Sequence, residues 1–197
     1  NAGKSLIQVI DNGIGMTETD ARLSLERHAT SKIDKVEDLF SLNTMGFRGE
    51  AVPSIAAVSQ MTITTKTENS ELASEICLEG SEIKSQEFCQ GKKGTNFSIK
   101  NLFFNIPARR NFLKSNGVEN RHIQEEFIRI ALAWPNIAMS YTNEGSELYR
   151  LPSSNFRQRI TALFGERYNQ RLVPVEESTD IVKIKGFIGK PEYAKKS

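Results

Sequence analysis

The sequence predicts an α+β fold, in which helices and a sheet form a two-layer α/β sandwich that is followed by the start of a second α/β domain. Short runs rich in apolar and β-branched residues recur along the 197 residues, and those between residues 61 and 101 follow one another as an antiparallel set. Helical periodicity is confined to separate stretches. A content of 38% hydrophobic and 25% charged residues is typical of a globular protein. No apolar run approaches the roughly 20 residues that a membrane span needs, so no membrane association is expected.

The first elements are set by one apolar run and one helix cap. Ser5–Ile10 (SLIQVI) predicts a strand, which the glycine-containing loop Asp11–Gly15 ends. Thr17 is a good helix cap with acidic residues after it, and the helix that it begins is expected to run toward His28. Two further short helices are predicted at Val36–Leu42, with Asp34 as its cap, and at Glu50–Val58, where Pro53 is tolerated in the first turn.

The middle of the chain predicts most of the sheet and the longest helix. Strands are expected at Met61–Thr67, Ala73–Leu78, Ile83–Phe88 and Thr95–Asn101. Asn105-Ile106-Pro107 opens a short basic helix that reaches Leu113. Glu119–Trp134 carries apolar residues at helical spacing. A hairpin of Ile137–Thr142 and Glu147–Leu151 follows, with its turn at Asn143-Glu144-Gly145.

The segment Leu151–Ser154 is the best candidate for a linker between domains. It predicts a first domain at residues 1–152 and the beginning of a second at residues 153–197. The second block contains a helix at Phe156–Phe164 and strands at Leu172–Val175 and Ile181–Ile188. Because so short a block is unlike a domain that folds unaided, we expect it to continue past Ser197.

The composition excludes several classes of protein. Cys77 and Cys89 are too few for a disulfide framework, which favours a reducing, cytoplasmic location. His28 and His122 lie far apart and have no neighbouring ligand pattern, so no structural zinc or other metal site is predicted. The net charge of +2 does not by itself indicate nucleic acid, although basic residues are in excess around residues 100–121 and 150–171.

One glycine loop has the chemistry of an adenine site. Asp11 stands where a strand ends, and its carboxylate can accept a hydrogen bond from the exocyclic amine of adenine, whereas the carbonyl of guanine would be repelled. Gly13 and Gly15 lack a Cβ, so a flat base can lie against the backbone. Ile14 and Met16 would supply apolar walls. Taken alone, the same five residues fit an ordinary Asp-Asn-Gly turn.

A second glycine-rich segment follows about thirty-five residues later. Gly46-Phe47-Arg48-Gly49-Glu50-Ala51 leads into a helix, and amides in such a segment can bind phosphates. Ala29-Thr30-Ser31-Lys32 adds two hydroxyl groups and an ammonium group. The Thr95 hydroxyl could share the adenine with Asp11. Together the segments indicate an adenine nucleotide pocket, although each alone also fits an ordinary surface.

These segments resemble the MutL family of DNA mismatch-repair ATPases. Asp11-x-Gly13-x-Gly15 is common to the superfamily that this family shares with topoisomerase ATPase domains, a heat-shock chaperone and sensor histidine kinases. Three other segments are specific to the mismatch-repair branch, and they argue against a topoisomerase: Ala29-Thr30-Ser31-Lys32, Gly46-Phe47-Arg48-Gly49-Glu50-Ala51 and Asn105-Ile106-Pro107-Ala108-Arg109-Arg110. The resemblance runs from the first residues to about Lys190.

The resemblance implies that the chain binds ATP with Mg²⁺. Asp11 and Thr95 would contact the adenine, and the other segments would form the lid and wrap the triphosphate. The implied ATP-binding residues are Asp11, Gly13, Gly15, Thr30, Ser31, Lys32, Gly46, Phe47, Arg48, Gly49, Glu50, Ala51 and Thr95. In this family ATP binding drives homodimerisation around DNA, and the protein couples a mismatch-recognition protein to downstream repair factors.

One departure from the family pattern concerns catalysis. The family's general-base glutamate and Mg²⁺-binding asparagine lie on a helix before the strand that ends at Asp11, and Asn1 is too close to Asp11 to stand on it. Hydrolysis needs both a positioned base and a metal. We therefore predict no catalytic residue and no metal ligand among these 197 residues, no ATP turnover by them alone, and exposed apolar sheet surface.

The basic residues support a further expectation and leave an alternative open. The candidates for sequence-independent contacts with DNA phosphates are Arg109, Arg110, Lys114, Arg157 and Arg159. Arg109 and Arg110 can equally pair with acidic residues inside the domain. The alternative function is a nucleotide-inactive module that only binds DNA or partner proteins.

Overall fold

The structure is a computed structural model that describes residues 1–33, 35–42 and 44–194. The chain divides into two units, Asn1–Asn116 and Gly117–Ser197. The predicted boundary after residue 152 concerns folding domains and stays a prediction.

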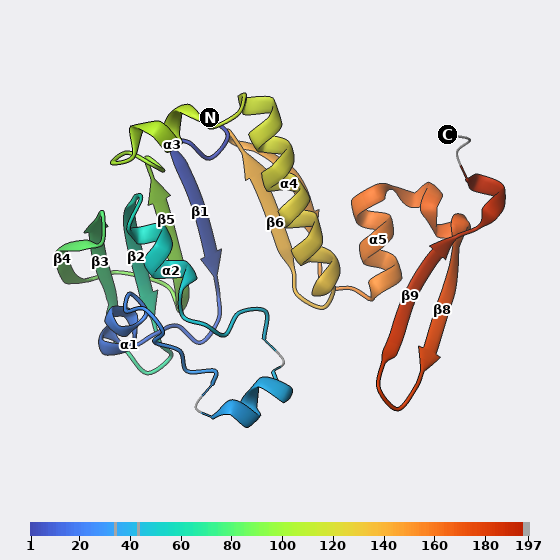
Figure 1. Cartoon of the computed structure of the whole chain (residues 1–197), viewed down its shortest axis with the longest axis horizontal. Coiled ribbons are helices and arrows are strands. Elements are labelled where there is room, and N and C mark those ends of the chain that lie inside the picture. The colour runs from blue at the N-terminus through green and yellow to red at the C-terminus, as the bar shows by residue number, and fades with distance from the viewer. Residues whose placement is uncertain (34, 43, 195–197) are drawn as a thin grey trace. The chain divides into compact units, whose positions relative to one another are not determined.

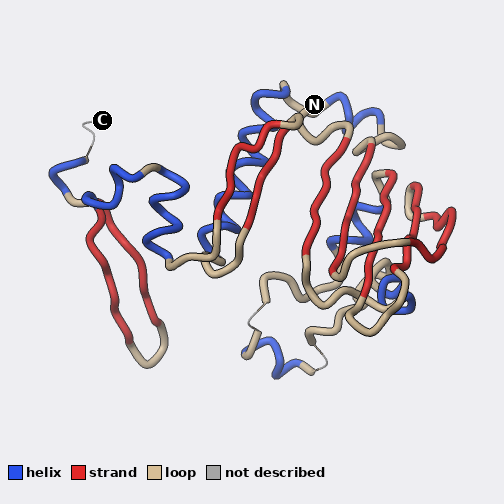
Figure 2. The backbone as a smooth tube through the Cα atoms, turned by 180° about the vertical axis from the view of Figure 1, so that it is seen from behind, coloured by secondary structure: helices blue, strands red, loops and turns tan. Residues whose placement is uncertain are grey.

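The first unit is built on a five-stranded antiparallel sheet with the order β1-β5-β2-β3-β4 (Figures 1 and 2). β5, the last of these five strands in sequence order, therefore pairs with both β1 and β2. The strands are β1 (Leu6–Asp11), β2 (Gln60–Lys66), β3 (Ala73–Glu79), β4 (Glu82–Cys89) and β5 (Gly94–Lys100). The five strands predicted from the sequence are confirmed, with ends that differ by at most one residue.

Two short helices, α1 (Glu18–Leu23) and α2 (Ala51–Ala56), cover one face of this sheet. The burial of β2 alternates residue by residue, as expected for a strand with one face in the core. Ile63 of β2 is fully buried, and Ala21 of α1 and Ala56 of α2 pack into the same core. The helices and the sheet form two layers, and the α+β class is confirmed.

The local signals predict the start of α1 better than its end. Thr17 caps α1 as predicted, through a bond from the Asp20 amide to its hydroxyl. The helix stops at Leu23, where the Ser24 hydroxyl donates to the Ala21 carbonyl, so it does not extend toward His28. The segment Val36–Phe40 is a 3₁₀-helix, η1, with Lys35 at its N-cap; the predicted cap, Asp34, lies outside the described residues. A further short helix, α3 (Pro107–Asn111), is close to its predicted range.

The second unit contains a helix, two hairpins and a small core. Ala131 of α4, Leu151 of β7 and Leu163 of α5 form that core. Its elements are α4 (Asn116–Ala133), β6 (Met139–Asn143), β7 (Ser146–Leu151), α5 (Phe156–Phe164), the 3₁₀-helix η2 (Glu166–Arg171), β8 (Leu172–Ser178), β9 (Lys183–Gly189) and the 3₁₀-helix η3 (Pro191–Tyr193).

Helix α5 has the range that the sequence predicts. The Asn155 side chain accepts a bond from the Gln158 amide, and the Asn155 amide donates a bond to the Gln158 side chain, which makes a capping box. Gly165 ends the helix at a φ of +102°, a conformation that glycine adopts easily.

Within the described ranges, none of the helices is long and apolar enough to cross a membrane. In the same ranges there is no cluster of His, Cys, Asp and Glu side chains that could hold a metal ion.

Candidate functional site

The Asp11 carboxylate is held in place at the end of β1. Its Oδ1 atom accepts bonds from the amides of Gly13, at 2.9 Å, and Thr95, at 3.2 Å. Among the described residues no donor bonds to Oδ2, and the side chain is exposed. The carboxylate is therefore oriented by the backbone and presents one free acceptor to solvent or a ligand.

Glycine is required in this loop because the backbone passes too close to other segments. A Cβ on Gly13 would lie 2.9 Å from Asp11 Oδ1. Gly15 has a φ of +70°, and a Cβ there would lie 2.0 Å from the carbonyl oxygen of Lys66. Gly94 has a φ of +111°, and its Cβ would lie 2.0 Å from the carbonyl oxygen of Asp11. Only glycine fits the two contacts with backbone atoms, those of Gly15 and Gly94, so the loop is held against the ends of β2 and β5.

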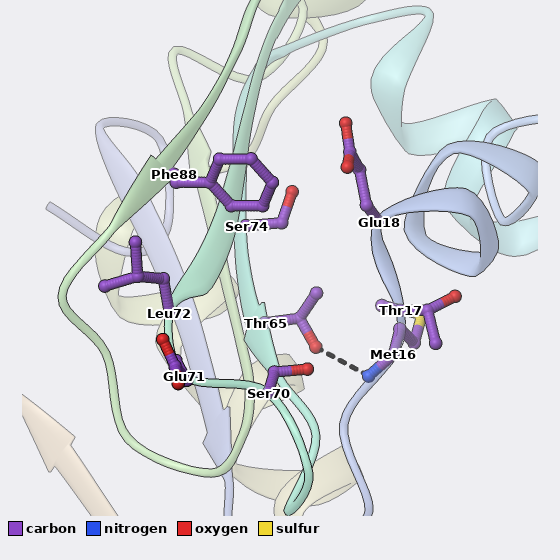
Figure 3. Close-up of a pocket in the computed structure, with 9 residues that line it drawn as sticks. All are labelled: Met16, Thr17, Glu18, Thr65, Ser70, Glu71, Leu72, Ser74 and Phe88. Atoms are coloured by element: carbon purple, nitrogen blue, oxygen red, sulfur yellow. Dashed lines mark hydrogen bonds between the residues drawn. The ribbon is translucent and has the colours of Figure 1, made fainter.

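A second threonine lies behind Thr95. The hydroxyl of Thr65, on β2, is 3.1 Å from the Thr95 hydroxyl and accepts a 2.9 Å bond from the Met16 amide (Figure 3). Thr95 is 7% exposed and Thr65 only 1%. The sequence analysis did not single out Thr65, because a threonine in a strand is common and only the strand pairing places it beside Thr95.

The two other motifs, segments 29–32 and 46–51, lie in contact with each other. Gly49 has a φ of +63°, and a Cβ there would lie 2.2 Å from the carbonyl oxygen of Ala29. The Glu50 carboxylate lies 3.3 Å from His28 Nδ1. Segment 29–32 and segment 46–51 are thus neighbours.

Most polar side chains of these two segments are exposed. The Thr30 hydroxyl accepts a 3.2 Å bond from the Lys32 amide. Ser31, Lys32 and Arg48 are exposed, and the Arg48 guanidinium lies 5.6 Å from the centre of the Phe47 ring. Among the described residues no hydrogen bond or ion pair joins this region to Asp11 and Thr95. Their joint role around one nucleotide stays a prediction.

A pocket of about 330 Å³ opens beside Thr65 (Figure 3). The Ser74 hydroxyl at its wall is buried and bonds to no described residue. The lining residues are Met16, Thr17, Glu18, Thr65, Ser70, Glu71, Leu72, Ser74 and Phe88.

The candidate DNA contacts differ in their exposure. Arg109 and Arg110 on α3 and Lys114 after it are exposed, and neither arginine forms an ion pair with an acidic residue in the described part of the chain. Arg157 is half-buried: its guanidinium bonds to the Asn169 side chain at 2.8 Å and lies 5.6 Å from the centre of the Phe187 ring.

Arg159 does not have the exposure that a DNA contact needs. Its side chain is fully buried, and its Nη2 atom donates to the carbonyl oxygens of Pro135, Ile137 and Pro152 at 2.7, 2.7 and 3.0 Å. Burial lowers the pKa of this guanidinium. Because these bonds hold three backbone segments together, we give Arg159 a structural role and leave it out of the DNA-contacting set.

Comparison with solved structures defines the class of protein. The structure aligns with the MutL ATPase domain of Aquifex aeolicus complexed with ADP at a TM-score of 0.67 and 26% identity, over 88% of this chain and 61% of that one. A second structure, the N-terminal domain of a DNA repair protein, aligns at 0.75 with 22% identity, over 96% of this chain and 60% of that one, and supports the fold alone. The fold is that of the ATPase domains of mismatch-repair proteins.

Sequence relatives identify the family. The chain is 61% identical over all 197 residues to the DNA mismatch repair protein MutL of Christiangramia forsetii, of which it covers 32%. It is 57% identical over 196 residues to the MutL of Bacteroides fragilis, of which it covers 31%. The chain belongs to the MutL family. It spans about a third of the length of these curated relatives, and no family model matches it.

Proposed function

We propose that this chain is the ATP-binding region of a DNA mismatch-repair protein that works as an ATP-driven conformational switch. The observation that carries the proposal is the geometry of Asp11. The amides of Gly13 and Thr95 engage one carboxylate oxygen and leave the other free at the end of β1. A fixed acceptor at this position suits the exocyclic amine of adenine and disfavours the carbonyl of guanine.

Segments 29–32 and 46–51 together suit the binding of the nucleotide phosphates. Segments 29–32 and 46–51 lie against each other through Gly49 and Ala29, and Lys32 and Arg48 are exposed there. Backbone amides of a glycine-rich loop and two cations can together offset the charge of a triphosphate. We propose that Thr30, Ser31, Lys32 and the segment Gly46–Ala51 bind it when the lid closes.

Hydrolysis and Mg²⁺ are proposed for the longer protein. The family resemblance assigns the base and the metal ligand to residues outside these 197. Bound Mg²⁺ would neutralise phosphate charge. We expect the 197-residue chain to bind ATP without releasing phosphate, and steady phosphate release by the purified chain would contradict this.

The cellular role follows from the family. The relatives carry the name DNA mismatch repair protein, and one similar ATPase domain was solved with ADP. We propose that ATP-dependent homodimerisation, binding of DNA, and contacts with a mismatch-recognition protein and downstream repair factors belong to the whole protein, acting in the cytoplasm.

Asp11→Asn tests the nucleotide assignment. An amide at this position can turn its NH₂ toward the base, which repels the adenine amine but can donate to the O6 atom of inosine. We expect ATP affinity to fall at least about tenfold, as for a lost hydrogen bond to a charged group, while binding of inosine triphosphate (ITP) is kept or improved. Asp180→Asn removes the same charge from an exposed site in the second unit and is the control. Equal ATP affinity of wild type and Asp11→Asn would overturn the assignment.

The DNA contact is tested by its salt dependence. Arg109 and Arg110 are exposed on α3 without an ion pair to a described acidic residue, and arginine–phosphate contacts release counterions. Changing both residues to glutamine should weaken binding to DNA of any sequence and flatten the dependence of affinity on salt. Gln substitution of the exposed Arg129, which pairs with Glu126, is the control. A DNA affinity unchanged by the double substitution would remove α3 from the interface. DNA binding by a chain that binds no ATP would favour the nucleotide-inactive module instead.

A further inference from the structure

Three residues of the adenine site occupy one row across the sheet. In the strand pairing Asp11 of β1 lies opposite Thr95 of β5, and Thr95 lies opposite Thr65 of β2. The row continues through Ser74 of β3 to Phe88 of β4. Residues in register across neighbouring strands have their side chains on the same face, so Thr65 is the next side chain after the two predicted base contacts.

The Thr65 hydroxyl takes part in three hydrogen bonds. It accepts from the Met16 amide at 2.9 Å, donates to the Gly94 carbonyl oxygen at 3.1 Å, and lies 3.1 Å from the Thr95 hydroxyl. An amide can only donate and a carbonyl can only accept. Because Thr65 has one hydroxyl proton, all three bonds form together only when that proton goes to Gly94 and Thr95 donates its own proton to Thr65.

This arrangement fixes what Thr95 offers to a ligand. Its proton is used by Thr65, and only lone pairs remain. Asp11 also presents only an acceptor, Oδ2, because its Oδ1 atom is engaged by two amides. The site therefore presents two acceptors side by side. An exocyclic amine has two N–H donors to match them, whereas a 6-oxo group has none.

We propose that Thr65 is a specificity-determining residue, which sets the Thr95 hydroxyl as an acceptor and thereby makes the site prefer a 6-amino purine to a 6-oxo purine. This inference rests on the proposed function, since it concerns the base of the same nucleotide. Thr65 is 1% exposed and lies behind Thr95, so it acts through Thr95 and is a positioning residue. Its bond to the Met16 amide also holds the glycine loop to β2 (Figure 3).

Thr65→Val tests the inference because valine has nearly the same shape and no hydroxyl. Removing the Thr65 acceptor frees the Thr95 proton, which can then be donated to the O6 atom of a 6-oxo purine. We expect the ratio of ATP affinity to ITP affinity to fall about tenfold, the value of one hydrogen bond that is gained or lost. Affinities are measured by calorimetric titration of the 197-residue chain with each nucleotide.

Thr65→Ser is the matched control. Serine keeps the hydroxyl and loses only the methyl group, so it should retain the wild-type ratio even if the fold is somewhat less stable. A purely structural role of Thr65 would lower both affinities together and leave the ratio unchanged. A Thr65→Val variant with the wild-type ratio overturns the inference and leaves the ATP assignment intact. A wild-type chain that binds no ATP overturns both.

A second variant covers the case in which Thr65→Val does not fold. If Thr95 faces the base only as an acceptor, Thr95→Val should weaken ATP binding and leave ITP binding equal or tighter, because a repulsion with O6 is removed. If the Thr95 proton is free in the wild type, Thr95→Val should weaken ITP binding as well. The second result overturns the inference without any substitution at Thr65.

Discussion

The substitution Gly15→Ala should strongly destabilise the first unit. Gly15 has a φ of +70°, and a methyl group there would lie 2.0 Å from the Lys66 carbonyl oxygen and 2.5 Å from its carbon. The left-handed backbone costs an alanine about 1–2 kcal/mol. The overlap with rigid backbone costs about 1–3 kcal/mol more as the loop or β2 shifts. Reduced entropy of the unfolded chain returns about 0.4–1 kcal/mol.

The net expectation is a loss of about 1–5 kcal/mol in the free energy of unfolding, a large part of the roughly 5–15 kcal/mol typical of a protein. Urea unfolding measures it, with ATP affinity as a second readout because the Met16 amide moves with residue 15. Gly46→Ala is the matched control: no atom lies within 4 Å of its Cβ, and its unfolding free energy should stay within about 1 kcal/mol of wild type. If Gly15→Ala is as stable as Gly46→Ala, the close approach of the loop to β2 is wrong.

Three further substitutions test other features. Arg159→Met removes three bonds from a buried charged donor to backbone carbonyls and should cost about 3 kcal/mol in urea unfolding; an unchanged midpoint would argue against its structural role. The hydrogen bond and charge of Lys93 lower the pKa of Glu68. The ion pair of Lys93 with Glu68 therefore stabilises the fold above the ordinary carboxyl pKa, and this stabilisation is lost as the pH falls through the lowered pKa of Glu68. Lys93→Gln should reduce the dependence of the unfolding free energy on pH in that range. Gly117→Ala places a better helix former in α4, where no atom lies within 4 Å of the Cβ; thermal unfolding should show a gain of about 0.5–1 kcal/mol, and a loss would contradict the open surroundings.

Local sequence signals predicted the elements that depend on neighbouring residues. Thr17, which the sequence predicted as a cap, does cap α1 through a bond to the amide three residues later. Asn155 caps α5 in the same way, although the sequence analysis predicted only the helix and not its cap. The alternation of β2 followed from the burial of one face of a sheet. Gly13 and Gly15 were named from the sequence as a surface for a flat base, which stays a prediction. The structure adds that Gly15 lies against the Lys66 carbonyl oxygen.

The sequence could not predict features that depend on long-range pairing. Arg159 is in a basic stretch, and its burial follows from carbonyls 7 to 24 residues away that converge on it. Thr65 is one threonine among several in β2, and its role depends on the insertion of β5 between β1 and β2. The contact of Gly49 with Ala29 likewise requires the tertiary fold.

The row Asp11–Thr95–Thr65 has a consequence for the folding kinetics of the chain. Asp11 and Thr95 are 84 residues apart in the sequence, so the pairing of β1 with β5 is a long-range contact. Long-range pairing of this kind forms slowly, and a slip of one residue would turn Thr65 or Thr95 to the opposite face. Nucleotide can bind only after that register is correct. Bound ATP should therefore slow the unfolding of the sheet and leave its rate of folding nearly unchanged.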